Sequence, residues 1–395
     1  MKKLLFLAIA LRILVSIFIF HPDIKTYNFQ SSFLKKGVFN IYNYLVENKK
    51  NLPLKDDFVY FPLTYFALGG YQAAVAPLVG SGFDSWLADA GTNSTVGNPH
   101  IFKYLLALKL PYLVLDIAIA FLLMLFFENE KDKKKAFVYW LFNPFTIVLI
   151  YVYSNVDIFP VILTLLGFLQ IKKQKMFPAA FLLGLASGFK LYPLLFIPFL
   201  FLTGRNLKEK ILLAATPLVT FVLIVLPFVS PAFIQSALVS GLTTGIFTSE
   251  FTTLGLSLLF FYALLMDKHI NLFNYWVFVF LIVFSFTLFH IQWLLWLAPF
   301  LVILAVKKPN LSSLIFLFSL AAVVIPLLYQ DRFMTISLFR IYSTWFDNLP
   351  TPFSVITKFY DTDNLRSVVH SFLAGGSLVM MFKVFKQDFV EGKNS

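Results

Sequence analysis

Ionisable side chains stand at the ends of long apolar runs, where each one requires a chemical reason. Asp23 follows the first run, Asp157 opens a later one, Lys190 separates two runs, and His290 opens another. A carboxylate or an imidazole can accept a proton, and an ammonium group can hold a phosphate. These residue types are therefore suited to binding a phosphate-bearing amphiphile and to activating a hydroxyl group.

Each of these four residues also has a structural interpretation. Asp23 could be a solvated loop carboxylate, and Asp157 could cap the N-terminus of a helix. Lys190 could extend its ammonium group to the lipid–water interface, and His290 could be a structural interfacial residue. The functional interpretation gains weight only if the four side chains gather at one membrane face.

Arg12 and Asp116 differ from these because each lies in the middle of an apolar run. An isolated charge at that depth is costly, and pairing with an opposite charge offsets the cost. Since the runs that carry them are expected to be neighbours, the sequence predicts a buried structural ion pair.

The composition identifies an integral membrane protein. Of 395 residues, 59% are hydrophobic and only 13% are charged, whereas about a quarter of a soluble domain is charged. The absence of cysteine excludes disulfides and thiolate chemistry, and five scattered histidines argue against a zinc site. The net charge of +12 fits lysines beside anionic lipid better than it fits nucleic-acid binding.

Apolar runs long enough to suggest membrane-spanning helices recur along the chain, since a span needs ~20 apolar residues. They lie near 4–20, 104–127, 136–153, 157–171, 176–189, 191–203, 211–229, 251–266, 272–289, 290–306, 311–329 and 367–385. We therefore predict an all-α polytopic fold with about 11–13 transmembrane helices.

The lysine clusters predict the orientation, because basic residues in short loops favour the cytoplasmic side. A cytoplasmic N-terminus then puts loops 21–103 and 330–366 outside, and segment 58–80 becomes a juxtamembrane or re-entrant element rather than a span. Residues 1–385 form one domain, and 386–395 form a cytoplasmic tail. The outer face would then carry Asp23, Asp157, Lys190 and His290, whereas the Arg12–Asp116 pair lies within the membrane. Five further candidates would also lie at the outer face, namely Asp56, Asp57, Gln292, Arg332 and Arg340.

Several motifs in this order resemble the C-type glycosyltransferases, which are polytopic enzymes that use lipid-phosphate-linked sugars. The resemblance is greatest to the mannosyltransferase-like group related to the second GPI mannosyltransferase and to polyprenyl-phosphate-mannose-dependent enzymes. The motifs are Asp23 before a long loop with 33–42, Tyr-x-Pro-Leu-x-Tyr at 60–65, 109–112 with Asp116, Asn143-Pro144, 155–157, 187–193 and 290–293. The chain departs from this group at Ser154-Asn155, where Gly-Gln is common, and at Ile291, where Glu or Pro is common.

The resemblance implies a role for each candidate. Asp23 would be the general base for an acceptor hydroxyl on a glycan or lipid, and polyprenyl phosphate would leave with inversion at the sugar. Donor phosphate or sugar would be bound by Lys190, Asp157, His290, Gln292, Arg332 and Arg340. Asp56 or Asp57 would share the base role or bind a divalent cation, the one cofactor that the sequence leaves open.

Two other functions remain as alternatives at this point. A multi-pass transporter or a flippase for lipid-linked glycans would also carry charges in the membrane, although these are expected near the midplane and in matched halves. A non-catalytic scaffold would not need the cluster of Asp23, Asp157 and Lys190.

Overall fold

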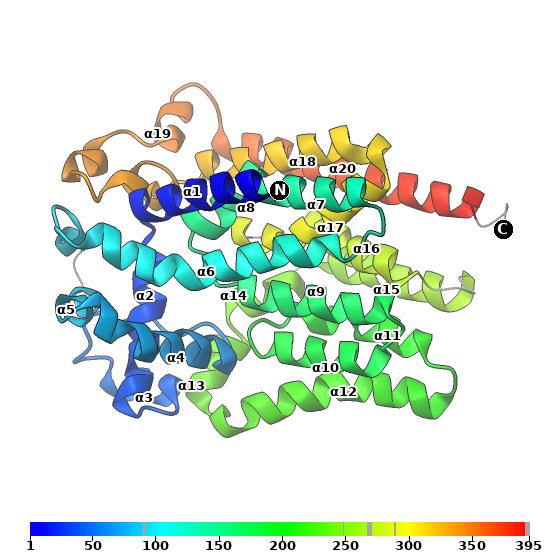
Figure 1. Cartoon of the computed structure of the whole chain (residues 1–395), viewed down its shortest axis with the longest axis horizontal. Helices are drawn as coiled ribbons and strands as arrows, with labels where there is room; N and C mark the ends of the chain where they lie inside the picture. Colours follow the sequence, from blue (N-terminus) through cyan, green and yellow to red (C-terminus); the bar gives the residue numbers. More distant parts are fainter. Residues whose placement is uncertain (90–91, 248, 267–270, 288–289, 392–395) are drawn as a thin grey trace.

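The computed structural model describes residues 1–89, 92–247, 249–266, 271–287 and 290–391, and these residues form helices and no strand (Figure 1). Four helices are long and apolar enough to cross a membrane, and two bent helix pairs also meet this criterion. The prediction of an all-α polytopic membrane protein is confirmed. Length alone identifies four to six spans, so the predicted 11–13 requires that the six shorter apolar helices cross as well.

The long elements, apart from α2, correspond to runs that the sequence predicted. They are α6 (Ile101–Met124), α12 (Leu207–Val225), α18 (Ser312–Val324), α20 (Thr362–Glu391), the bent pair α1 (Lys2–Phe18) and α2 (Pro22–Ser31), and the bent pair α7 (Glu130–Leu141) and α8 (Pro144–Ile147). The shorter apolar helices include α9 (Ile158–Lys172), α10 (Met176–Ser187), α11 (Ile197–Thr203), α15 (Glu250–Met266), α16 (Leu272–Phe286) and α17 (Ala298–Lys307).

Short helices of the first loop gather at one end of the helical bundle, on the left in Figure 1. They are α2, α3 (Ile41–Asn48), α4 (Pro62–Val79) and α5 (Gly82–Ala88), and we call this end the loop end. The late-loop helix α19 (Pro352–Ile356) and the short helices α13 (Pro231–Phe233) and α14 (Gly241–Thr244) complete the set of α-helices. The opposite end, where α9 and α17 finish, is called the lysine end.

Helix α4 occupies the segment that was predicted as juxtamembrane or re-entrant. It is not among the four long apolar helices, and it packs against α2 and the 3-10 turn Ser32–Lys36. Gly69 allows this approach, because a Cβ atom there would lie 2.6 Å from the Ser31 carbonyl oxygen. The close contact fixes α4 beside the end of α2.

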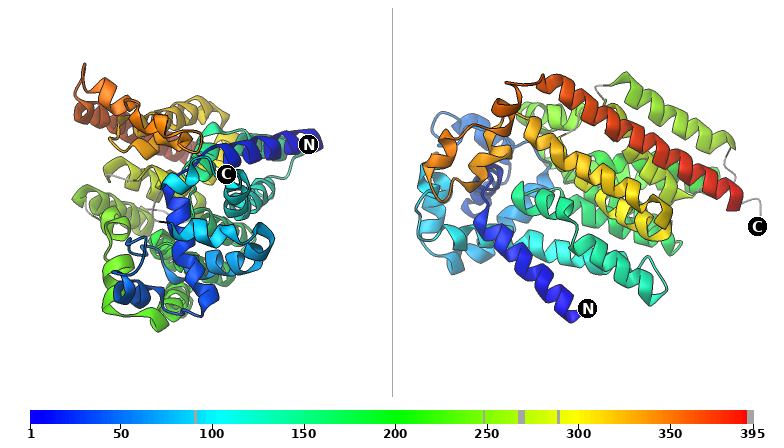
Figure 2. Two further views of the ribbon diagram at one scale, coloured as in Figure 1. Left: turned by 90° about the vertical axis from the view of Figure 1, so that its left-hand side faces the viewer. Right: turned by 90° about the horizontal axis from the view of Figure 1, so that it is seen from above.

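The core of the bundle is rich in aromatic side chains. All residues of α16 from Leu272 to Ser285 are buried, as expected for a helix that is apolar on every side. Trp276 of this helix stacks on Phe196, with ring centroids 4.2 Å apart. Figure 2 shows α1 and α20 at the outside of the bundle, where exposed apolar side chains such as Phe6 and Phe382 suit contact with lipid.

A break divides the run 136–153 into α7 and α8, which meet at 45°. Pro144 cannot donate a backbone hydrogen bond, and the Asn143 side chain instead accepts from Phe145 N, 3.0 Å away. A π-helical turn, η3 (Val148–Val152), follows and ends just before Tyr153. The kink thus delivers residues 153–157 to the loop end.

Candidate functional site

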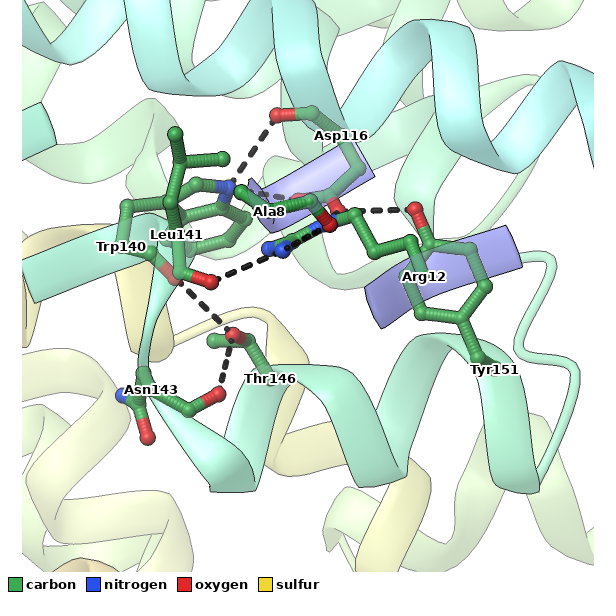
Figure 3. Close-up of polar contacts among 8 residues, drawn as sticks. All are labelled: Ala8, Arg12, Asp116, Trp140, Leu141, Asn143, Thr146 and Tyr151. Atoms are coloured by element: carbon green, nitrogen blue, oxygen red, sulfur yellow. Dashed lines mark hydrogen bonds and ion pairs between the residues drawn. The ribbon is translucent and has the colours of Figure 1, made fainter. Parts of the chain in front are cut away.

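Arg12 and Asp116 form a buried ion pair between α1 and α6 (Figure 3). The guanidinium Nη1 also donates to the Leu141 carbonyl at 2.8 Å, while Nη2 has no partner. Asp116 accepts from Trp140 Nε1 at 2.6 Å and from the Tyr151 hydroxyl at 2.8 Å. This network joins α1, α6, α7 and η3, and its carboxylate is fully engaged by protein groups.

Lys109 makes a second connection between these elements. Its ammonium group is buried and donates to the carbonyl oxygens of Ile19 and Tyr151, both at 2.7 Å. Ile19 precedes the His21-Pro22-Asp23 segment, and Tyr151 precedes the segment that ends at Asp157. Lys109 therefore ties together the two chain segments that carry the acidic candidates.

Asp157 and Lys190 face each other at the loop end of α9 and α10. Their charged atoms, Oδ1 and Nζ, are 3.8 Å apart, and both side chains are buried. Asp157 occupies the N-cap position of α9 without capping it through its side chain. Its Oδ2 instead accepts from Trp296 Nε1 at 2.8 Å, so the capping interpretation does not describe this carboxylate.

Aromatic rings surround the ammonium group of Lys190. The Nζ atom lies 5.0 Å from the ring centroid of Tyr60 and 5.9 Å from the centroids of both Trp293 and Trp296. Burial lowers the pKa of Lys190, while Asp157 opposes this shift. The ammonium group is thus held by ring faces and one carboxylate, and the interpretation of Lys190 as an interfacial side chain does not describe its position.

Asp23 lies in the first turn of α2, directly after the 85° bend that separates α1 from α2. Pro22 starts the helix, a position where its missing N–H is not needed. Asp23 Oδ2 accepts from the Tyr27 hydroxyl at 2.8 Å, and the Tyr27 ring packs edge-to-face on Tyr60 with centroids 4.9 Å apart. Because Tyr60 also contacts Lys190, the chain of contacts links Asp23 to the Asp157–Lys190 pair.

His21 adjoins Asp23 without providing a fixed positive charge. Its Nδ1 accepts a hydrogen bond from the Asp23 backbone N–H at 3.3 Å, and it lies 3.6 Å from Asp23 Oδ2. Burial lowers the pKa of His21 despite the opposing effect of Asp23. The Asp23 carboxylate is one-third exposed, so it combines solvent access with a hydroxyl donor and a neutral imidazole.

His290 directly precedes the 3-10 turn η8 (Ile291–Leu295), and Gln292 lies in its first part. His290 has an exposed surface, yet the protein on its other side lowers its pKa by desolvation, and the charges of Asp23, Lys190 and Asp157 also act on it. Gln292 instead has a structural contact, because its side chain donates to the Tyr153 carbonyl at 3.2 Å. Of these two residues, only His290 is exposed.

The loop 153–157 contains one residue in a left-handed backbone conformation and is held by side-chain hydrogen bonds. Ser154 adopts φ 52°, a left-handed conformation that is uncommon for serine. Asn155 stabilises the turn, since its side chain accepts from Asp157 N at 2.9 Å and donates to the Gln292 carbonyl at 2.8 Å. These two hydrogen bonds of the Asn155 side chain hold Asp157 against η8.

Gly188 has a comparable role for Lys190. Its carbonyl accepts from Leu63 N at 3.1 Å, and a Cβ atom at Gly188 would lie 2.6 Å from the Leu63 side chain. The absence of a side chain therefore brings the start of α4, with Tyr60 before it, against the segment that carries Lys190.

Four other candidates lie apart from these contacts. Asp57 is exposed and pairs with Lys49 at 2.9 Å, and the Asp56 side chain is also exposed. Within the late loop, Arg332 donates to the Leu349 carbonyl at 3.0 Å and Arg340 pairs with Asp347 at 3.2 Å. Among the residues that the structure describes, no group of three or more His, Asp or Glu side chains could hold a metal ion.

We call the residues that the structure brings together the loop-end cluster: Asp23, Tyr27, Tyr60, Asp157, Lys190, His290, Trp293 and Trp296. The aromatic members were not predicted from the sequence. Tyr27 could have been found, because it lies four residues after Asp23 on the same helical face. Tyr60 and Trp293 lie in the motifs at 60–65 and 290–293, but nothing in the spacing of these motifs indicated that a lysine lies between the two rings.

The helical fold and the ionisable cluster at its loop end describe an integral membrane protein with charged groups gathered at one end. The family model for Glycosyltransferase family 87 matches residues 98–299, roughly half of the chain. The chain therefore belongs to glycosyltransferase family 87, a family of C-type polytopic glycosyltransferases, and the predicted superfamily is confirmed. No curated protein and no solved structure matches the chain.

The family assignment favours the enzyme over the transporter, flippase and scaffold alternatives. The protein is an integral membrane glycosyltransferase, and such a family implies a lipid-linked sugar donor and an acceptor. The matched residues include Asp116, Asp157, Lys190 and His290, whereas Asp23 precedes the matched region.

Proposed function

We propose that the protein transfers a hexose, most simply mannose, from a polyprenyl-phosphate donor to a hydroxyl group of a glycan or lipid acceptor. The observation that carries the proposal is the buried, ring-enclosed Lys190 ammonium group within a chain of contacts that ends at the solvent-accessible carboxylate of Asp23. A cation for phosphate and a base for a hydroxyl group are the two groups that this reaction requires.

In the proposed reaction, Asp23 accepts the proton of the acceptor hydroxyl group as its oxygen attacks the anomeric carbon of the donor sugar. The bond between this carbon and the phosphate oxygen breaks, and the electron pair leaves with polyprenyl phosphate. A single displacement of this kind inverts the configuration at the anomeric carbon. Tyr27, which donates to Asp23, keeps the carboxylate oriented.

Lys190 would neutralise the charge that grows on the departing phosphate. Its 3.8 Å separation from Asp157 is longer than a short charge-assisted hydrogen bond, so its N–H groups retain the capacity to bind phosphate oxygens. Asp157, fixed by Trp296, would keep the ammonium group charged in its buried position. His290 would contact the sugar or the phosphate from the exposed side.

The roles of the remaining candidates are narrower. Gln292 would support η8 rather than bind sugar, because its side chain is used by Tyr153. Arg332 and Arg340 would act on the donor only after leaving their contacts in the late loop. Asp56 and Asp57 would be available for an acceptor or a divalent cation at the exposed surface.

We further propose that the enzyme lies in a prokaryotic plasma membrane with a cytoplasmic N-terminus and with the loop-end cluster on the outer face. The lysines at the opposite end support this orientation, because basic residues favour the cytoplasmic side. Externally added membrane-impermeant reagent should label a cysteine introduced at Asp57 and should not label one introduced at Lys173. The reverse labelling would contradict the orientation.

The experiment that tests the transfer reaction uses the purified protein reconstituted with a panel of polyprenyl-phosphate hexoses. Radiolabelled sugar should move to an acceptor, or to water at a slower rate, in the unmodified protein. Asp23→Asn should abolish this turnover, whereas Asp84→Asn, a matched removal of an exposed carboxylate from the same loop, should retain it. If Asp23→Asn keeps turnover, the base is not Asp23.

A further inference from the structure

A second polar site lies at the lysine end of the molecule. A cavity with a volume of about 750 Å³ opens between the ends of α9, α11, α12, α15, α16 and α17. Sites for small ligands typically have volumes of ~300–1,000 Å³. The cavity is remote from the loop-end cluster, because α9 runs its full length from Asp157 to Lys172 at the cavity. We call it the lysine-end cavity.

Three lysines from three different helices line this cavity, namely Lys172, Lys210 and Lys307. The Lys172 ammonium group donates to the Leu125 carbonyl at 3.3 Å. The Nζ atoms of Lys210 and Lys307 lie 5.8 Å and 4.9 Å from phenylalanine ring centroids. None of the described lining residues is acidic.

The remaining lining residues divide into a polar part and an apolar part. Thr203, Gln174 and Asn271 offer uncharged hydrogen-bonding groups beside the lysines. Phe168 and Leu264 belong to the apolar wall. A ligand that fits both parts has an anionic headgroup with hydroxyl or ester oxygens and an attached apolar segment.

The membrane itself can supply such a ligand, because the lysine end lies at the membrane face opposite the loop-end cluster. Anionic phospholipids are attracted to lysines at the membrane surface, and basic pockets between helices bind their headgroups. A lysine cluster that only faced water would not need a concave wall, hydrogen-bonding neighbours and an apolar floor. The combination distinguishes this cavity from the solvated lysines at the start of α7, such as Lys131 and Lys134, which do not line it.

We propose that the lysine-end cavity binds the phosphate-bearing headgroup of an anionic phospholipid, with the three lysines contacting the phosphate and the apolar wall contacting the acyl chains. A soluble phosphate compound shares the same charged group, and the experiment separates the two sources. The proposal does not depend on glycosyl transfer, because its ligand, its residues and its membrane face all differ from those of the loop-end cluster.

The test measures lipid binding to the purified full chain by native mass spectrometry and by thermal shift. The probes are dioctanoyl phosphatidylglycerol, dioctanoyl phosphatidylcholine as a lipid without net charge, and inorganic phosphate. The first variant is Lys172→Gln/Lys210→Gln/Lys307→Gln. The matched control, Lys131→Gln/Lys134→Gln/Lys208→Gln, removes the same charge from exposed lysines that do not line the cavity.

Phosphatidylglycerol should bind the unmodified protein more tightly than phosphatidylcholine. The cavity variant should bind phosphatidylglycerol about tenfold or more weakly, and the control variant should change by less than about twofold. Equal weakening in both variants would overturn the proposal, because it would mean that net charge alone attracts the lipid. Displacement of the lipid by millimolar inorganic phosphate would overturn the lipid as occupant and would assign the cavity to a soluble phosphate compound.

Discussion

Two buried polar clusters in this protein use similar residues in opposite ways. In the Arg12–Asp116 network, each oxygen of the carboxylate receives protein hydrogen bonds, and both side chains are fully buried. In the loop-end cluster, the ammonium group of Lys190 meets ring faces and a carboxylate at 3.8 Å, and Asp23 is one-third exposed. In the first arrangement both carboxylate oxygens are bound by protein groups, whereas the second holds charged groups that, in our proposal, bind a ligand.

The difference indicates how a membrane enzyme separates stability from chemistry. A charge whose partners all belong to the protein connects helices, and its loss leaves an uncompensated buried group. A charge held by aromatic faces is desolvated but remains able to interact with a substrate phosphate. Lys109 stands between the two clusters, since it fixes the segments before Asp23 and before Asp157 through their carbonyl oxygens.

The largest expected effect on stability comes from breaking the Arg12–Asp116 pair. Arg12→Leu should lower the free energy of unfolding by about 3–5 kcal/mol, because the buried Asp116 carboxylate would lose its charged partner. The loss is measured as a shift in the thermal unfolding midpoint in detergent. Arg366→Leu, which removes an exposed arginine from its pair with Asp363, is the matched control and should leave the midpoint nearly unchanged.

The double variant Arg12→Leu/Asp116→Leu sharpens this prediction. It should recover part of the lost stability relative to either single variant, because neither charge is left alone, although Trp140 and Tyr151 would still lose their acceptor. A double variant that is as unstable as the sum of the two single variants would show that the pair has no coupling energy.

A change at Lys190 should affect substrate binding rather than folding. Lys190→Gln should weaken binding of a polyprenyl-phosphate donor by about 10- to 100-fold, the equivalent of one charge-assisted hydrogen bond worth ~1.5–3 kcal/mol. Lys190→Arg should retain more of the affinity because it keeps the charge. Lys190→Gln could instead lose as much thermal stability as Arg12→Leu while its folded fraction binds the donor with unchanged affinity. This result would show that Lys190, like Arg12, has a structural role.

The pH dependence of donor affinity provides a third comparison. Since burial lowers the pKa of Lys190, the ammonium group loses its proton at a lower pH than an ordinary lysine with a pKa of 10.5. Donor affinity should therefore be full at low pH and should fall as pH rises through this lowered pKa. Lys190→Arg should move the decline to higher pH, and an identical decline in Lys190→Arg would assign it to another group.

The smallest predicted effect belongs to Tyr27. Tyr27→Phe removes the hydroxyl donor to Asp23 and keeps the ring contact with Tyr60, so turnover should fall by up to about tenfold, corresponding to ~0.5–1.5 kcal/mol. Tyr139→Phe, at an exposed position in α7, is a control that should not change turnover. Equal activity of Tyr27→Phe and the unmodified protein would remove Tyr27 from the orientation of Asp23.

Much of the fold could be predicted from the sequence because apolar runs and lysine positions reflect the bilayer directly. Most of the helical segments were located in this way. The breaks were harder to predict, since the run 136–153 divides at Asn143-Pro144 and ends in a π-helical turn. A hydropathy pattern reports the burial of a segment and does not report its bends.

The site was predictable only where charge and apolar surroundings conflict. Asp157 and Lys190 stood out for this reason, and the structure brings them together. The surface acids Asp56 and Asp57 and the late-loop arginines had no such conflict, and their contacts lie elsewhere. The aromatic members remained hidden because a chain with 50 phenylalanines and 17 tyrosines gives no sign of which rings surround a cation.

The most direct measurement compares Asp23→Asn with Asp116→Asn, each assayed for sugar transfer from a polyprenyl-phosphate hexose and for its thermal unfolding midpoint. Asp23→Asn should lose transfer by about 10²–10⁴-fold, as expected for removal of a general base, with an unchanged midpoint. Asp116→Asn should lower the midpoint while its folded fraction keeps the rate of transfer per molecule. Full transfer by Asp23→Asn, or a folded Asp116→Asn that cannot transfer, would contradict the division between a catalytic and a structural cluster.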